Sequence, residues 1–260
     1  YDVLKTQQNP ELINLTEYSQ PMIFILSSII IDICRNKIID DNTNITLAGH
    51  SLGEYCALYF AKSLRFEEML AVVKSRGESM SIVSDPEKYA MYAILKKDDQ
   101  EINEETLIDG VYIANINSDK QIVICGFKEK LEIFREQNPI GKYIPLNVSA
   151  PFHSELMLES SKLFLDNIKN IKFNKINFDL LSNHKLKNYK NIPESDFINQ
   201  LSLQIHSPVM WLDTIKEITR SGISKFIEIG PKKTLLNFIP KNFDAEKIFI
   251  TSSEDIDSYV

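Results

Sequence analysis

The sequence is poor in cysteine and glycine, and each shortage excludes a class of protein. Only three cysteines, Cys34, Cys56 and Cys125, occur among 260 residues, far apart and without a Cys-x-x-Cys pair. This spacing argues against a disulfide framework and against a zinc site, so we expect no metal and a reducing, cytoplasmic location. The 8 glycines are too few for a flexible hinge region.

Positive charge and long apolar runs are also scarce. The chain has 29 lysines and arginines against 36 aspartates and glutamates, a net charge of −7, whereas a nucleic-acid partner requires a clustered basic surface. The most apolar segment, Met22–Cys34, contains Asp32 and is shorter than the roughly 20 residues of a membrane span. We therefore expect neither a nucleic-acid partner nor a membrane segment, and interpret this run as a buried helix.

The order of predicted elements indicates an α/β fold with two subdomains. Residues 88–149 are predicted as strand, helix, strand, strand, helix, strand, the β-α-β-β-α-β order of a ferredoxin-like subdomain. Residues 1–87 and 150–260 are predicted as a hydrolase-like large subdomain with a parallel sheet, into which the small one is inserted. Hydrophobic residues at 43% and charged residues at 25% are ordinary for a globular protein of this kind.

Apolar periodicity and turn residues give the expected bounds of the elements. Helices are predicted at 53–64, 101–108, 128–137, 155–168 and 209–220. Strands are predicted at 45–48, 91–95, 111–116, 122–125, 143–148, 177–182 and 225–229.

Ser51 stands in the run Gly49-His50-Ser51-Leu52-Gly53, after a predicted buried strand and before a predicted helix. In a Gly-x-Ser-x-Gly turn of this kind the serine hydroxyl is lifted clear of the sheet, and the glycines remove side chains that would clash. The backbone N–H of Leu52 then lies at a helix N-terminus and can donate to an oxyanion. By itself the motif fits an esterase, a lipase or a transferase equally.

A nucleophilic serine needs a base to accept its proton, and the chain has four histidines. His153 follows a predicted strand and precedes a predicted helix, where catalytic groups of α/β folds emerge, so we predict that it is the base. His50 is adjacent to Ser51, and neighbours on an extended turn point apart, so we expect it to line the pocket. His184 and His206 lie among polar residues and are expected at the surface.

Several other blocks of sequence accompany the serine run. They are Lys74–Met80, Asn115–Asn117 with Gln121–Val123, Ser149–Ser154, Gln204–Trp211 and Glu228–Lys232. Together with Gly49–Glu54 they resemble the malonyl-CoA:acyl-carrier-protein transacylase family in content, order and spacing. The resemblance runs from about Leu15 to Phe238.

The resemblance implies a reaction and roles for residues. Ser51 would take the malonyl group from malonyl-CoA with His153 as base, then pass it to the phosphopantetheine thiol of an acyl carrier protein in a ping-pong transfer. The family orients its histidine through backbone carbonyl groups, and Gln204 matches the position near it. Arg76 would hold the malonyl carboxylate, since a guanidinium binds a carboxylate through two charged hydrogen bonds.

The implied substrate-binding residues are Arg76, Gln204, Gln20, His50 and Phe152. Phe152 and Leu52 are similar to those of malonyl-selective members. No bound cofactor is implied, because malonyl-CoA is a substrate and the phosphopantetheine arm belongs to the partner protein. We expect a monomer that serves fatty-acid or polyketide synthesis, with a slight preference for polyketide synthesis.

The acidic carrier protein would need a local basic patch on this acidic chain. Two clusters are candidates, and an ordinary solvated surface is an equal alternative for both. They are Lys185, Lys187 and Lys190, and Lys232 and Lys233.

The sequence departs from the family at its start. Family members begin with a strand that ends in a Gly-Gln-Gly-x-Gln turn and supplies a second oxyanion N–H, and no such run occurs here. We expect about 30 to 40 residues upstream of Tyr1 in the natural protein. Two alternatives stay open: a hydrolase that clears acyl groups from carrier proteins, and a non-catalytic docking protein. Arg76 speaks against the hydrolase, because a carboxylate clamp suits malonyl better than a long apolar chain.

Overall fold

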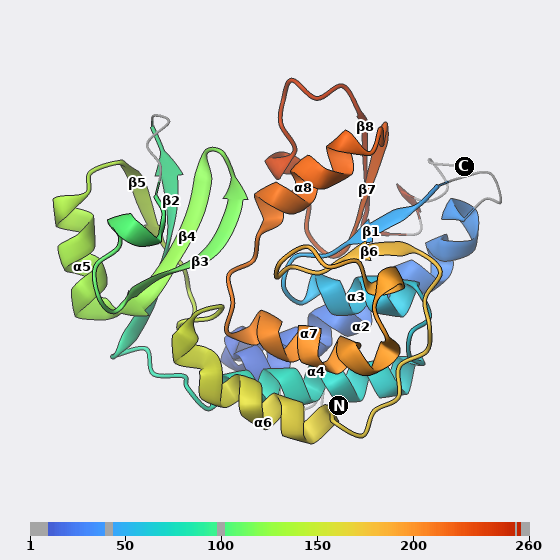
Figure 1. Ribbon diagram of the computed structural model, residues 1–260, viewed down its shortest axis with the longest axis horizontal. Helices are drawn as coiled ribbons and strands as arrows, with labels where there is room; N and C mark the ends of the chain where they lie inside the picture. The colour runs from blue at the N-terminus through green and yellow to red at the C-terminus, as the bar shows by residue number, and fades with distance from the viewer. Residues whose placement is uncertain (1–9, 40–43, 98–101, 253, 256–260) are drawn as a thin grey trace.

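The computed structural model describes residues 10–39, 44–97, 102–252 and 254–255. The chain forms a small subdomain built on one antiparallel sheet, beside a larger one in which helices surround short parallel strands (Figure 1). The predicted α/β class with a small ferredoxin-like subdomain is confirmed.

The helices and strands carry the labels of Figure 1. The α-helices are α2 (Thr16–Ile38), α3 (Gly53–Phe60), α4 (Phe66–Ser81), α5 (Lys128–Gln137), α6 (Leu158–Ile168), α7 (Glu194–Ile205) and α8 (Trp211–Arg220). The strands are β1 (Thr46–Ala48), β2 (Tyr89–Lys96), β3 (Val111–Ser118), β4 (Gln121–Phe127), β5 (Gly141–Pro145), β6 (Asp179–Leu181), β7 (Lys225–Ile229) and β8 (Glu246–Ile250). Short 3₁₀ helices are η1 (Pro10–Asn14), η2 (Glu104–Thr106), η3 (Glu155–Met157), η4 (Tyr189–Asn191) and η5 (Leu235–Phe238).

The small subdomain has the sheet order β3-β4-β2-β5, with every neighbouring pair antiparallel. Alternation along the strands buries one face under α5, whose Leu131 and Phe134 pack on Ile94 and Ile124. The predicted helix over 128–137 has the bounds of α5.

The helix predicted over 101–108 is wrong. Residue 101 lies outside the described residues, and the rest contains only the 3₁₀ turn η2. Asn103 and Thr106 explain the difference. The Asn103 side chain accepts from the Thr106 N–H at 3.2 Å, and the Thr106 hydroxyl donates to the Asn103 carbonyl at 2.8 Å. Such local bonds compete with a continuous helix.

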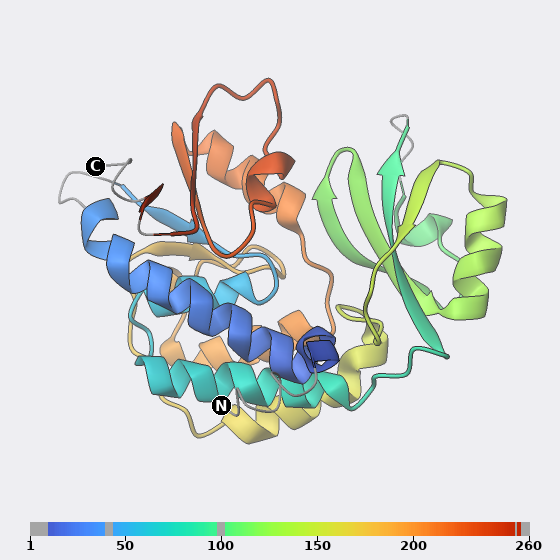
Figure 2. The ribbon, with the colours of Figure 1, turned by 180° about the vertical axis from the view of Figure 1, so that it is seen from behind.

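The large subdomain holds its parallel strands in two pairs, β1 with β6 and β7 with β8, among the residues described. Helices α2, α4, α6 and α7 pack side by side below the strands (Figure 2). Their shared core includes Phe24, Tyr55, Met69, Phe164 and Leu201. α3 follows β1 after a short turn, which places that turn above the helical layer.

The helix predicted over 22–34 is present in α2, but only one of its faces is buried. α2 buries Phe24 and Cys34 completely. On another face it leaves large apolar side chains 41% to 53% exposed, namely Ile23, Leu26, Ile29 and Ile33. A run that is apolar on every face does not indicate which face packs on the protein. In the described ranges no helix is long and apolar enough to cross a membrane.

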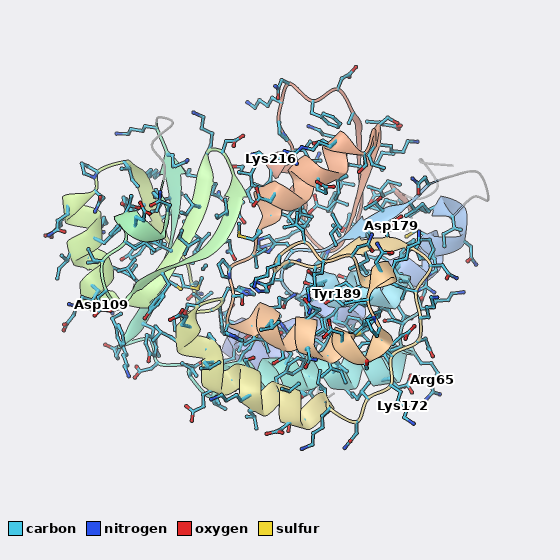
Figure 3. The ribbon with its side chains drawn as sticks, in the orientation of Figure 1. Arg65, Asp109, Lys172, Asp179, Tyr189 and Lys216 are labelled. Atoms are coloured by element: carbon cyan, nitrogen blue, oxygen red, sulfur yellow. The ribbon has the colours of Figure 1, made fainter. Side chains whose placement is uncertain are left out.

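The two subdomains are joined by backbone pairing as well as by the connecting chain. The Val209 N–H donates to Ala114 of β3 at 2.9 Å, and the Ile116 N–H donates back to the Val209 carbonyl at 2.9 Å. Lys216 of α8, labelled in Figure 3, lies 3.5 Å from the Asp119 carboxylate in the β3–β4 turn. The segment before α8 is therefore held against the small subdomain.

Candidate active site

Ser51 lies in a strained turn between β1 and α3. Its φ is 51°, in the left-handed region that non-glycine residues rarely adopt. The turn closes through the Gly53 N–H, which donates to the His50 carbonyl at 2.8 Å. Such a conformation costs about 1–3 kcal/mol and persists only where neighbouring groups hold it.

The two glycines of the motif are not equivalent. A Cβ on Gly49 would lie 2.0 Å from the backbone carbon and oxygen of Gly53. A Cβ on Gly53 would meet nothing within 4 Å. The steric requirement predicted from the sequence therefore holds for Gly49 and is wrong for Gly53.

The structure brings His153 to Ser51 from a distant part of the chain. Ser51 Oγ lies 2.7 Å from His153 Nε2. His153 Nδ1 lies 2.9 Å from the Gln204 carbonyl oxygen, which can only accept, so Nδ1 carries the proton and Nε2 is free to take one from the serine. His153 also has a positive φ of 63°, and its N–H donates to the Ile205 carbonyl.

The environment of His153 keeps the imidazole neutral. The ring is buried, and burial lowers the pKa of His153 to about 3, with the nearby Arg76 cation as the second cause. A neutral imidazole is the form that can act as a base.

Arg76 projects from α4 directly beside Ser51. It is 1% exposed, and its Nη2 donates to Ser51 Oγ at 3.0 Å and to Gln204 Oε1 at 2.9 Å. Its Nη1 donates to Gln20 Oε1. Among the residues that the structure describes, Arg76 forms no ion pair with a carboxylate. This cation is held by neutral oxygens next to the nucleophile.

Gln20 and Gln204 flank the guanidinium of Arg76. Gln20 comes from α2 and also donates to Thr16 Oγ1 at 2.6 Å. Gln204, at the end of α7, donates from Nε2 to the Ser51 carbonyl at 3.0 Å. The two glutamines named by the sequence analysis therefore meet at one cation.

The remaining predicted residues surround the turn. Leu52 is half-buried at the start of α3, and within the described chain its backbone N–H has no acceptor. His50 points to the small subdomain, with Nε2 2.9 Å from Asn117 Oδ1. Phe152 packs against the cores of both subdomains.

Sequence reasoning missed Glu54 and Asn183, which lie behind the site. Asn183 Oδ1 accepts the Ser51 N–H at 2.5 Å, and Glu54 is fully buried next to the turn. Asn183 follows a predicted strand just as Ser51 does, and carboxyl ends of neighbouring parallel strands meet. That signal was available from the sequence.

Two further details concern metal binding and the other histidines. Within the described ranges, no group of three or more His, Cys, Asp or Glu side chains is placed to hold a metal ion. His184 and His206, which were expected at the surface, are both half-buried.

Comparison with known proteins identifies the family of the chain. Residues 1–256 match the acyl transferase domain family. The polyketide biosynthesis malonyl CoA-acyl carrier protein transacylase PksC of Bacillus subtilis (strain 168) is 32% identical over 233 residues, covering 87% of this chain and 78% of that protein. The malonyl CoA-acyl carrier protein transacylase of Synechocystis sp. (strain ATCC 27184 / PCC 6803 / Kazusa) is 33% identical over 236 residues, covering 90% of this chain and 77% of that protein.

Solved structures give the same result. The crystal structure of the malonyl-CoA:ACP transacylase of Synechocystis sp. PCC 6803 has a TM-score of 0.83 at 30% identity, covering 95% of this chain and 82% of that one. A type II polyketide-synthase acyl-carrier protein in complex with its malonyl-transacylase gives a TM-score of 0.89 at 28% identity, with coverages of 99% and 85%. The chain belongs to the acyl transferase domain family.

Proposed function

We propose that this chain transfers a malonyl group from malonyl-CoA to the phosphopantetheine thiol of an acyl carrier protein, through a malonyl ester on Ser51. The names of its relatives support the substrates and the partner. The side chains around Ser51 support the roles that we propose for Ser51, His153 and Arg76. Several relatives are named for polyketide biosynthesis, and we propose that the chain serves either that pathway or fatty-acid synthesis.

In the first half-reaction, Ser51 Oγ attacks the thioester carbonyl while its proton moves to His153 Nε2, 2.7 Å away. The carbonyl oxygen becomes an oxyanion, to which the Leu52 N–H can donate a hydrogen bond. Collapse of this intermediate breaks the carbon–sulfur bond, and the CoA sulfur leaves with the proton from Nε2. The products are malonyl-Ser51 and CoA, with His153 neutral again.

In the second half-reaction, His153 takes the proton of the carrier's phosphopantetheine thiol. The thiolate attacks the malonyl-serine ester, the ester bond to Oγ breaks, and Oγ takes the proton back from Nε2. The Gln204 carbonyl holds the same tautomer of His153 through both steps.

One observation carries the choice of malonyl: the Arg76 guanidinium lies buried 3.0 Å from Ser51 Oγ. Burying a cation costs free energy unless an anion or well-placed acceptors accept its hydrogen bonds. A malonyl carboxylate can replace the neutral acceptors with two charged hydrogen bonds, and an acetyl or fatty acyl chain cannot.

We do not assign carrier docking to the whole cluster of Lys185, Lys187 and Lys190. Lys187 lies 3.8 Å from Asp196 and Lys190 lies 3.2 Å from Asp179, so their charge is partly neutralised. Lys232 and Lys233 are exposed and stay candidates for contact with an acidic carrier protein.

The test is a product assay with malonyl-CoA and a carrier protein that bears its phosphopantetheine arm. The proposal predicts that the carrier gains the mass of one malonyl group and that little free malonate appears. Dominant release of free malonate would support the hydrolase, and no turnover at all would support the docking protein. Ser51→Ala should abolish every product.

A further inference from the structure

A single buried carboxylate connects the parts of the site, and the proposed reaction does not use it. Glu54, the second residue of α3, is 0% exposed. Its Oε2 accepts from Gln204 Nε2 at 2.6 Å and from the Asn183 backbone N–H at 3.1 Å. Its Oε1 accepts from the Tyr189 hydroxyl, and Figure 3 shows Tyr189 in the region of α3 and α7.

Asn183 transmits this anchor to the nucleophile. Its Oδ1 accepts the Ser51 N–H at 2.5 Å, and its Nδ2 donates to the Gly49 carbonyl at 2.5 Å. The two bonds fix the backbone on both sides of His50 and so support the left-handed conformation of Ser51. The Asn183 backbone is itself fixed from two sides, by Glu54 and by the Met210 N–H, which donates to the Asn183 carbonyl at 3.1 Å.

Gln204 transmits the same anchor to the base and to the cation. Its backbone carbonyl accepts from His153 Nδ1, its side-chain oxygen accepts from Arg76, and its side-chain nitrogen donates to Glu54 and to the Ser51 carbonyl. The side-chain amide therefore has both ends occupied. Without Glu54, its nitrogen keeps the Ser51 carbonyl as acceptor and loses Glu54 Oε2.

We propose that Glu54 and Asn183 are positioning residues for Ser51 and His153. Asn183 holds the Ser51 turn directly, and Glu54 acts through Asn183 and Gln204 to keep Ser51 and His153 at reacting distance. The inference rests on the proposed roles of Ser51 and His153. Burial raises the pKa of Glu54, and its hydrogen-bond donors and the Arg76 charge oppose that rise. The role depends on an acceptor oxygen at the Oε2 position.

The test measures the rate at which a small alkyl fluorophosphonate labels Ser51. In labelling, the bond from Oγ to phosphorus forms, fluoride leaves and His153 takes the serine proton. The probe bears no carboxylate, so the readout does not depend on malonyl binding. Variants are Glu54→Leu, Glu54→Gln and Asn183→Ala, each also assayed by urea unfolding.

Two matched controls separate positioning from stability. Glu228 is a second buried glutamate and accepts three backbone N–H groups at 2.8–2.9 Å, from Thr234, Leu235 and Leu236. Asn188 is a second asparagine that accepts backbone N–H groups, from Leu180 and Lys190. Glu228→Leu and Asn188→Ala remove the same kinds of bond elsewhere.

Labelling should fall by about 10²-fold in Glu54→Leu and Asn183→Ala, the usual effect of moving reacting groups by about 1 Å. Glu54→Gln should label within about tenfold of wild type, because its amide oxygen can occupy the Oε2 position and the Tyr189 hydroxyl can accept from its amide. Glu228→Leu and Asn188→Ala should lose stability and label like wild type.

Wild-type labelling rates in Glu54→Leu and Asn183→Ala would overturn the inference. If Glu54→Leu does not fold, Asn183→Ala decides, since it removes only one side-chain amide. A wild-type protein that labels at Ser51 but takes no malonyl group would contradict the proposed function, and the same variants would still decide this inference.

Discussion

At the scale of single residues, Arg76 sets the preference for the acyl group. Its guanidinium is buried beside Ser51 and bonded to neutral oxygens. Arg76→Ala should lower kcat/KM for malonyl-CoA relative to acetyl-CoA by about 10²- to 10⁴-fold, because two charged hydrogen bonds are lost and each contributes about 1.5–3 kcal/mol. The measurement is the ratio of the two kcat/KM values, since loss of the bond to Ser51 affects both substrates.

Arg76→Lys is the matched control for this prediction. It keeps the charge and loses the two parallel donors, so its ratio should lie between those of wild type and Arg76→Ala. If Arg76→Ala left the ratio of the two kcat/KM values unchanged, Arg76 would not bind the malonyl carboxylate.

His153 makes a second prediction, on stability against pH. Its pKa is about 3 when folded and about 6.5 when unfolded. Between these values the unfolded chain binds a proton that the folded protein does not, so the stability due to neutral His153 is lost as pH falls below about 6.5. From pH 7 to pH 5 this loss is about 2 kcal/mol.

The comparison is with His153→Asn, which cannot titrate in this range. Urea unfolding at pH 7 and pH 5 should show a fall in unfolding free energy that is about 2 kcal/mol larger for wild type than for the variant. All other groups cancel in this difference. Equal falls in both proteins would show that the folded histidine titrates near its ordinary pKa.

At the scale of elements, the turn between β1 and α3 depends on one glycine. Gly49→Ala would force a Cβ to 2.0 Å from the Gly53 backbone, so we expect loss of labelling at Ser51 together with a stability loss of several kcal/mol. Gly53→Ala is free of contacts and should stay within about 1 kcal/mol of wild type in stability. If urea unfolding gave the same unfolding free energy for Gly49→Ala and Gly53→Ala, the turn would not depend on Gly49 alone.

Elements with their own local signals were predictable from the sequence. α5 follows from its apolar spacing and the small subdomain's strands from their alternation, because each pattern is set within one segment. α7 was not predicted, although Pro193 with Glu194 and Asp196 is a usual helix start. The helix at 101–108 failed because Asn103 and Thr106 bond locally.

At the scale of the whole molecule, the site draws on elements that lie far apart in the chain. Ser51, His153 and Arg76 could be named from the sequence because each stands in a recognisable block. Asn183 could have been placed near Ser51, because it follows a predicted strand as Ser51 does. Glu54 could not be given a role, because its importance arises from contacts over more than 100 residues, 135 in the case of Tyr189. Such contacts follow from packing and leave no spacing pattern.

The junction of the subdomains makes a further prediction at this scale. Lys216 and Asp119 form an ion pair whose side chains are 44% and 65% exposed. Exposed pairs contribute little, so Lys216→Ala should reduce the unfolding free energy by less than about 1 kcal/mol and leave malonyl transfer unchanged. A larger loss of either quantity would mean that this pair, rather than backbone pairing at Val209, holds the subdomains in register.

The proposed reaction requires Ser51 to carry the malonyl group between its donor and its acceptor. The most direct measurement is intact-protein mass spectrometry after malonyl-CoA is added alone, with peptide mapping of the modified residue. The account predicts one malonyl group on Ser51, which disappears when the carrier protein is added and never forms in Ser51→Ala. Carrier malonylation without any adduct on Ser51, or an adduct at another residue, would contradict it.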